Sequence, residues 1–126
     1  MGQPVVHFEI IGKDGQALAA FYSELFGWNI DANNEYNYGV IAREENLDHE
    51  GVGIGGGIGA GPPGYEGHVT VYVEVPDVEA TLAKVESMGG KRLMGPESMT
   101  GNRGTMTLGQ FADTEGHVIG VIGSES

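Results

Sequence analysis

Histidine and carboxylate side chains alternate with apolar residues in two segments of the chain. In "HFEI" the polar pair is His7 and Glu9. In "HVTVYVEV" valines alternate with His68, Thr70, Tyr72 and Glu74. Successive side chains of a β-strand point to opposite faces, so each polar set is expected to share one face of a strand. Imidazole, hydroxyl and carboxylate groups on one face could hold a metal ion, transfer protons or bind a polar ligand.

His7 and Glu9 are the candidates for catalysis, although each has another interpretation. A neighbouring imidazolium and burial would push the pKa of Glu9 in opposite directions, and a carboxylate tuned in this way could act as a general base. Glu9 could equally be a structural acid or lie at a subunit interface. His7 could contact a ligand, hold a metal, or simply be hydrogen-bonded within its strand.

The sequence gives less reason to assign a function to the remaining histidines. His68 follows Gly67 at the entrance to its strand and is expected to be exposed to solvent. His49 lies in the charged segment "EENLDHE", and His117 occupies a turn after Gly116.

A metal site at a new position is a further hypothesis, because two histidines and two carboxylates would suffice chemically. Its ligands would be His7, Glu9, His68 and Glu74.

Composition excludes several classes of function. The formal net charge is −12 for 126 residues, which argues against nucleic acids and anionic membranes as partners because both attract positive surfaces. The chain has no cysteine, so disulfides, thiolate zinc sites and a cysteine nucleophile are excluded. No segment resembles a signal peptide or a membrane span, and a cytoplasmic location is therefore expected.

The glycine-rich stretch "GVGIGGGIGAGPPG" at residues 51–64 matches a dinucleotide-binding pattern only superficially. Gly51, Gly53 and Gly56 have the spacing G-x-G-x-x-G. That motif requires a helix directly after the glycines, whose N-terminus binds the pyrophosphate. Here more glycine and the pair Pro62-Pro63 follow, so the nucleotide interpretation is rejected.

Periodicity and capping signals predict a strand, a helix and three strands in the first half of the chain. Residues 5–11 read as a strand, and Asp14 stands where a helix N-cap belongs. Gly27 is a helix stop. The apolar residues of this helix, which recur at helical spacing, are Leu18, Phe21, Tyr22 and Leu25. The three further strands are expected at residues 28–32, 36–43 and 52–58.

The second half repeats this order of elements. Asp77 lies 63 residues after Asp14 and would cap a helix that stops at Gly90, the residue 63 positions after Gly27. Strands are expected at residues 68–75, 91–94, 105–111 and 117–122. We interpret the chain as an internal duplication. It predicts a single α+β domain of two βαβββ modules, at about 4–59 and 67–123, with a linker at about 60–66.

The segments "HFEIIGKDGQALAAFYSELFGW" and "DTEGHVIGVI", together with the duplication, resemble the vicinal oxygen chelate superfamily of glyoxalases, bleomycin-resistance proteins and extradiol dioxygenases. The resemblance extends from His7 to Ile122. It implies a cup-shaped, glyoxalase/bleomycin-resistance-like fold and a homodimer. It also implies a divalent metal in the catalytic members of the family.

The four metal-ligand positions of the family can be located in this chain from the resemblance. They fall on His7, Thr70, Gly57 and Gly120. A catalytic zinc site uses at least three protein ligands, and glycine offers no side-chain donor. We therefore expect no metal cofactor, with a divalent metal as the alternative.

The resemblance also implies that the polar strand faces line the cup and bind a small organic molecule. The expected ligand-binding residues are His7, Glu9, Thr70, Tyr72, Glu74, Trp28 and Tyr38. Tyr36 and Met106 are further candidates whose facing the sequence does not fix. A metal-dependent glyoxalase- or dioxygenase-type enzyme is the alternative function, and a non-catalytic scaffold is the third.

Overall fold

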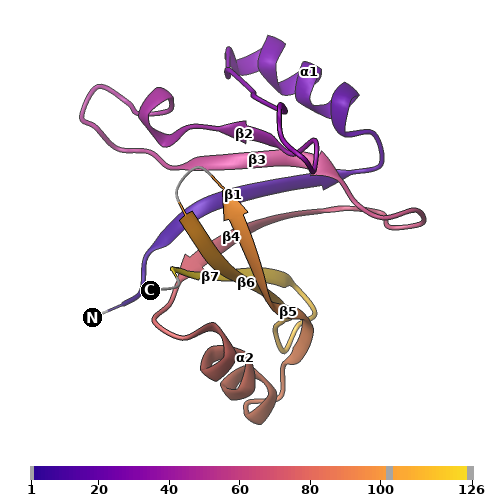
Figure 1. Cartoon of the computed structure of the whole chain (residues 1–126), viewed down its shortest axis with the longest axis vertical. Helices are drawn as coiled ribbons and strands as arrows, with labels where there is room; N and C mark the ends of the chain where they lie inside the picture. Colours follow the sequence, from indigo (N-terminus) through magenta and orange to yellow (C-terminus); the bar gives the residue numbers. More distant parts are fainter. Residues whose placement is uncertain (1, 102–103, 125–126) are drawn as a thin grey trace. The chain divides into compact units, whose positions relative to one another are not determined.

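The computed structural model describes residues 2–101 and 104–124, and it has the α+β composition that the sequence predicts (Figure 1). In chain order the elements are β1 (Val5–Gly12), α1 (Gly15–Phe26), β2 (Gly39–Ile41), the short 3-10 helix η1 (Arg43–Glu45), β3 (Gly55–Ala60), β4 (His68–Glu74), α2 (Val78–Ser87), β5 (Lys91–Gly101), β6 (Gly104–Ala112) and β7 (Val118–Ser124). Neither helix in these residues is long and apolar enough to cross a membrane.

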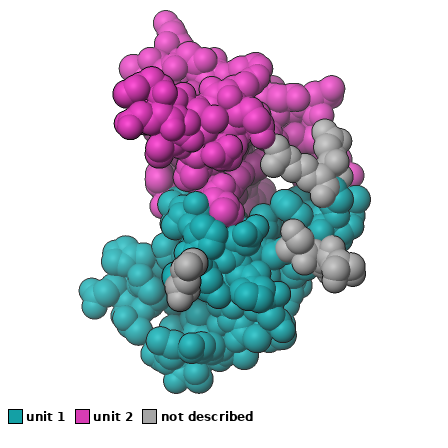
Figure 2. Space-filling model, turned by 90° about the vertical axis from the view of Figure 1, so that its left-hand side faces the viewer, with its two compact units in different colours: residues 1–5, 70–126 teal, residues 6–69 magenta. Residues whose placement is uncertain are grey.

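The chain divides into two compact units, which Figure 2 distinguishes by colour. Unit 2 is Val6–Val69, and unit 1 is Met1–Val5 together with Thr70–Ser126. The segment expected to link the modules therefore belongs to unit 2, as do the first two residues of β4. Each unit contains one of the two helices.

In unit 2 the sheet has β3 at its centre. β3 pairs in parallel with β1 and antiparallel with β2. Ile10, Ile41 and Ile58, one from each strand, form the buried core. Phe8 and residues of α1 pack against this core, so Phe8 and Ile10 lie on the side of β1 that faces the helix.

Helix α1 begins and ends where the capping signals predict. The Asp14 side chain accepts a hydrogen bond from the backbone N–H of Ala17 at 3.0 Å. Gly27 ends the helix in the left-handed conformation, with φ 72°, which glycine adopts without steric cost. The predicted apolar stripe nevertheless divides between two faces. Leu18 and Tyr22 pack on the core, whereas Phe21 and Leu25 are exposed to solvent.

The strand predicted at residues 28–32 is wrong in extent. Only Asp31 pairs there, through an isolated bridge to Val40. The Asn34 side-chain oxygen accepts hydrogen bonds from the backbone N–H groups of Tyr36 and Tyr38, at 3.1 Å and 3.0 Å. Because a local side chain satisfies these backbone groups, the segment forms a turn and the bridge does not extend into a ladder.

In unit 1, β7 pairs in parallel with β4 and antiparallel with β6. β6 also pairs antiparallel with β5. Asp77 caps α2 through a 3.0 Å hydrogen bond from the backbone N–H of Ala80. The buried core of this unit consists of Val75, Val78, Leu82 and Val121. Helix α2 thus covers its sheet with Val78 and Leu82.

Strand pairing repeats between the units at the offset found in the sequence. Glu9 lies opposite Gly57 in unit 2, and Tyr72 lies opposite Gly120 in unit 1. Each residue of the second pair follows its counterpart by 63 positions. The two central pairings of the modules are therefore equivalent in position, although the residues differ.

The helix–sheet packing of unit 1 generates a stability prediction. We expect Leu82→Ala to lower the free energy of unfolding by about 2–5 kcal/mol, because Leu82 is fully buried and truncation leaves a cavity. Met88→Ala is the matched control, since Met88 follows the same helix but is 67% exposed. Urea unfolding monitored by circular dichroism measures both. Equal losses in the two variants would contradict the assigned core.

Candidate functional site

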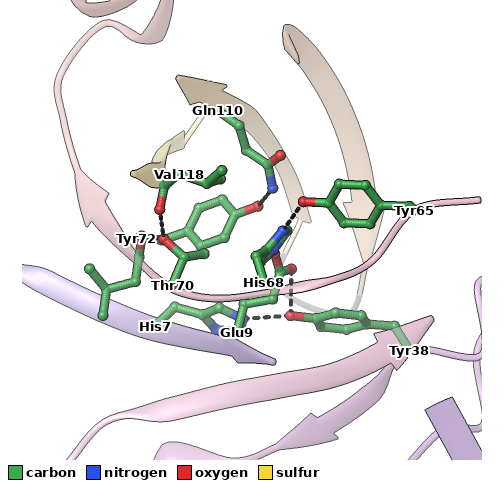
Figure 3. A network of polar contacts seen from close by, with 10 residues as sticks. His7, Glu9, Tyr38, Tyr65, His68, Thr70, Tyr72, Gln110 and Val118 are labelled. Atoms are coloured by element: carbon green, nitrogen blue, oxygen red, sulfur yellow. Dashed lines mark hydrogen bonds and ion pairs between the residues drawn. The ribbon is translucent and has the colours of Figure 1, made fainter. Parts of the chain in front are cut away.

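A hydrogen-bond network of side chains in unit 2 contains both residues that the sequence analysis proposed for catalysis (Figure 3). His7 and Glu9 lie on β1, and Tyr38 comes from the turn just before β2. The Tyr38 hydroxyl donates to Glu9 Oε1 at 3.0 Å and lies 2.9 Å from His7 Nε2. One phenol therefore connects the imidazole with the carboxylate.

The second oxygen of Glu9 extends this hydrogen-bond network toward the segment between β3 and β4. Glu9 Oε2 lies 2.7 Å from His68 Nε2, and His68 Nδ1 lies 2.5 Å from the Tyr65 hydroxyl. The side chains of Glu9 and His68 are both only 10% exposed. The expectation of a solvent-exposed His68 is thus wrong, because its ring turns inward to a buried carboxylate instead of outward at the strand entrance.

The hydrogen bonds of this network are all directed toward Glu9. Tyr38 has one hydrogen and gives it to the carboxylate, so its oxygen accepts from His7 Nε2. His68 Nε2 donates to the other carboxylate oxygen, and for a neutral ring Tyr65 donates to Nδ1. The protein itself supplies a donor to each oxygen of Glu9. A buried carboxylate is stable in such a setting because its oxygens are paired.

Burial lowers the pKa of His7 below its ordinary value of 6.5, and the negative charge of Glu9 opposes this with a smaller effect. A neutral imidazole has one donor and one acceptor nitrogen. The lowered pKa therefore favours a ring that donates to Tyr38 from Nε2 and keeps Nδ1 as an acceptor.

In unit 1 the expected ligand-binding residues Thr70 and Tyr72 are both buried on β4. The Thr70 hydroxyl donates to the carbonyl oxygen of Val118. The Tyr72 hydroxyl accepts a 2.8 Å hydrogen bond from Gln110 Nε2 (Figure 3). Glu74, at the end of the same strand, is exposed, so it shares the face of Thr70 and Tyr72 but not their burial.

Tyrosine rings occupy the space where two of the family's metal ligands would extend. A Cβ placed on Gly57 would lie 2.0 Å from ring atoms of Tyr38, and one placed on Gly120 would lie 2.4 Å from the ring of Tyr72. Real Cβ atoms do not approach other atoms so closely. Neither position can carry a carboxylate while its tyrosine stays in place.

The residues at the four ligand positions consequently do not fit the family's metal site. Two of the positions have no side chain, and Thr70 contributes a hydroxyl that donates to a backbone carbonyl. His7 is the one strong donor at these positions. The hypothesis of a relocated site receives no support either, since no group of three or more His, Cys, Asp or Glu suited to a metal occurs within residues 2–101 and 104–124.

Within the described residues of unit 2, no hydrogen bond joins Trp28, Tyr36 or His49 to this hydrogen-bond network. Trp28 packs on the core side of β1, where its ring centroid is 5.3 Å from that of Phe8. Tyr36 is 57% exposed. His49 and His117 have largely exposed side chains, as the sequence predicts. The sequence did not fix which face Trp28 occupies, and its role in ligand binding stays a prediction.

Two residues that the sequence analysis missed, Tyr65 and Gln110, complete these contacts. Tyr65 lies in the segment expected to be a simple linker, and its hydroxyl reaches His68. Gln110 lies on β6, 38 positions after the tyrosine that it contacts. Only the position of a polar amide between Gly109 and Phe111 in the strand segment "TMTLGQFA" could have indicated Gln110.

Comparison with known proteins identifies the class to which this fold and site belong. The family model described as Glyoxalase/Bleomycin resistance protein/Dioxygenase superfamily matches residues 5–121. The chain belongs to this superfamily, and the resemblance inferred from sequence is confirmed.

Individual relatives agree with this assignment. Two mycobacterial proteins, from Mycobacterium bovis and Mycobacterium tuberculosis, bear the name "Putative glyoxylase CFP32" and are each 33% identical over 112 residues. The match covers 86% of this chain but only 41% of those proteins. The chain therefore corresponds to less than half of each curated relative.

Solved structures of the superfamily share the fold. A superfamily member from Vibrio splendidus 12B01 matches with a TM-score of 0.61 and 16% identity, over 98% of this chain and 100% of its own. A Streptomyces coelicolor methylmalonyl-CoA epimerase in complex with 2-nitronate-propionyl-CoA gives a TM-score of 0.61 at 18% identity, over 98% and 99% of the two chains. At these identities the likeness establishes the α+β fold alone.

The contact between Gly57 and Tyr38 generates a mutational prediction. We expect Gly57→Ala to cost about 1–3 kcal/mol, because the new Cβ forces the Tyr38 ring away from His7 and Glu9. Combining it with Tyr38→Ala should cost less than the sum of the single variants, since the clash is already gone. Urea unfolding of the four proteins measures the coupling. Gly2→Ala is the control, because a Cβ there would meet nothing within 4 Å. Additive costs would refute the assigned contact.

The lowered pKa of His7 predicts a titration in NMR. The imidazole of His7 should protonate with a midpoint below 6.5 in the folded protein and near 6.5 in the urea-unfolded chain, with His7→Asn giving the assignment. Protonation is then disfavoured in the folded state. The contribution of His7 to stability is present above pH 6.5 and is lost as the pH falls through the folded midpoint. A folded midpoint at or above 6.5 would show that burial does not dominate.

Proposed function

We propose that this chain binds a small organic molecule and does so without the metal that the superfamily commonly uses. One observation carries the proposal. The rings of Tyr38 and Tyr72 fill the space that a side chain at Gly57 or Gly120 would need. The same replacement of a carboxylate by a glycine and a ring occurs in both modules, which argues for a site converted from metal binding to another use.

The side chains of the polar network supply the means of recognition. His7, Glu9 and Tyr38 combine an imidazole, a carboxylate and a phenol on one side of unit 2. In unit 1 the corresponding groups are Thr70 and Tyr72, with the exposed Glu74 at the end of their strand. The net charge of −12 for the whole chain favours ligands that are cationic or rich in hydrogen-bond donors.

A metal-dependent glyoxalase- or dioxygenase-type enzyme is the second candidate function. The name of the curated relatives, which are 33% identical, supports it. Against it stands the ligand set, since catalytic zinc uses three protein ligands and the family positions here provide one imidazole. A scaffold that binds no small molecule is the third candidate, and the experiment below separates all three.

Metal content and ligand-induced stabilisation test this proposal together. We expect less than about a tenth of an equivalent of any transition metal in protein grown in metal-replete medium, because a partial ligand set binds weakly. In thermal-shift screening against aldehydes, catechols and cationic antibiotics, a hit at a hundredfold excess over its dissociation constant should stabilise the fold by about 2.7 kcal/mol, with or without EDTA.

The variants and controls make this outcome specific. Glu9→Gln should weaken the response to a hit, whereas His117→Asn, which alters a largely exposed histidine, should leave it unchanged. Stoichiometric metal together with isomerisation of a methylglyoxal-derived hemithioacetal would establish the enzyme instead. No stabilisation by any compound, at low metal content, would favour the scaffold.

A further inference from the structure

The sheet of unit 1 has a second face, opposite the one on which α2 packs. Val121 on β7 belongs to the core that α2 covers. A Cβ placed on Gly109 of β6 would lie 2.8 Å from Leu82 of the same helix. Because successive side chains of a strand point to opposite faces, the neighbouring residues Ile122 and Leu108 lie on the face away from α2.

Strand register places four residues of this second face in one row across the sheet. Glu74 on β4 is paired with Ile122 on β7. Ile122 is also paired with Leu108 on β6, and Leu108 is paired with Glu97 on β5. Paired residues of neighbouring strands share a face, so the row has a carboxylate at each end and two apolar side chains between them. Neighbouring strands lie about 4.8 Å apart, which separates the backbones of the two glutamates by about 14 Å.

The apolar part of the row continues toward the hairpin between β5 and β6. Met99 and Met106 are paired with each other on the same face, each two residues along its strand from the row. Together with Ile122 and Leu108 they form an apolar strip, and all four side chains are partly exposed. Methionine is flexible and polarisable and adapts to apolar groups of different shape. The strip is therefore suited to contact an apolar or aromatic body.

The two glutamates of the row are exposed, and within residues 2–101 and 104–124 neither side chain forms an ion pair. The described cations of unit 1 lie elsewhere. Arg92 is paired with glutamates of α2, and Lys84 belongs to that helix. Lys91 is paired with Ala112, four residues along β6 from Leu108, a separation of about 14 Å at the rise of a strand. Both ends of the row are therefore negatively charged without a neighbouring cation in the described part of the unit.

We propose that this row of unit 1 binds a hydrophobic dication, a small molecule that has an apolar body and an amine cation at each end. The inference rests on the function proposed above and specifies the class of ligand. The apolar body lies on the strip, and the two cations pair with Glu74 and Glu97. Charge complementarity favours this occupant, because both ends of the row are acidic and the whole chain has a net charge of −12.

Other occupants match this face less well. A divalent metal ion between the two glutamates would lie on isoleucine and leucine side chains, which offer none of the oxygen ligands that such ions require. A dicarboxylate would be repelled at both ends of the row. A protein partner needs about 800 Å² on each side for a standard stable interface, which is far more than four partly exposed side chains provide.

Isothermal titration calorimetry of the full chain with α,ω-diaminooctane, at about 0.05 M NaCl, tests the proposal. We expect saturable binding with a dissociation constant below about 1 mM, and weaker binding at about 0.5 M NaCl because salt screens exposed charge pairs. Octylamine, which has the same body and one cation, should bind about threefold more weakly. The uncharged α,ω-octanediol and the dianion octanedioate should bind more weakly still.

Substitutions in the row test where the diamine binds. Glu74→Gln and Glu97→Gln should each raise the dissociation constant of diaminooctane about threefold, and the double variant about tenfold. Met99→Gln should also raise it, because it replaces part of the apolar strip with a polar side chain of similar length. Glu115→Gln is the matched control, since it removes one negative charge from an exposed residue outside the row; it should leave the dissociation constant unchanged. Circular dichroism verifies that each variant is folded.

The outcomes separate this proposal from the function on which it rests. Absence of saturable diaminooctane binding, equal binding of octanediol, or binding that both glutamate variants preserve would overturn the hydrophobic dication. A diamine response that Glu9→Gln weakens and the row variants do not would also reject this site, while the proposed function would stand. The proposed function itself fails on stoichiometric metal or on the absence of any hit in the wider thermal-shift screen.

Discussion

In each unit of this protein a tyrosine ring lies against a glycine, and the arrangement of the polar side chains depends on these two contacts. Gly57 has no Cβ, so the ring of Tyr38 can lie over β3 and bring its hydroxyl between His7 and Glu9. In unit 1 the ring of Tyr72 lies over Gly120 in the same way and its hydroxyl meets Gln110. The two tyrosines come from different positions in their modules, since the repeat counterpart of Tyr72 is Glu9. The same steric solution was thus reached with different residues.

These contacts change what a member of the superfamily can do with its first strand. A histidine that binds a metal uses a ring nitrogen as an electron-pair donor, whereas Nε2 of His7 donates a hydrogen bond to the Tyr38 hydroxyl oxygen. Glu9, which is buried, has a protein donor at each oxygen. The protein thereby satisfies a buried carboxylate with neutral donors and its own histidine. Both oxygens of the buried Glu9 are thus engaged by side chains of unit 2 itself.

The sequence predicted the features that local chemistry determines and missed those that depend on distant contacts. Asp14, Asp77 and Gly27 indicated the helix boundaries because capping acts within one turn. Alternation correctly grouped Thr70 and Tyr72 on one face of β4, yet it did not show that this face is the buried one and that Val69 is 76% exposed. Contacts such as His68 with Glu9, which are 59 positions apart, leave no periodic signal. The roles of Tyr65 and Gln110 depend on such contacts and could not be deduced from spacing.

Duplication explains both the shared framework of the two modules and the way in which they differ. Equivalent strand pairs place Gly57 and Gly120 at matching backbone positions, where an added side chain would meet a tyrosine ring. The outer surfaces of the helices are under no such constraint. α2 is surrounded by a charged cluster centred on Arg92, and α1 exposes Phe21, Leu25 and Phe26. A module that must keep its core can still diverge on its solvent face, because an exposed side chain there packs against few others and its replacement leaves the core unchanged.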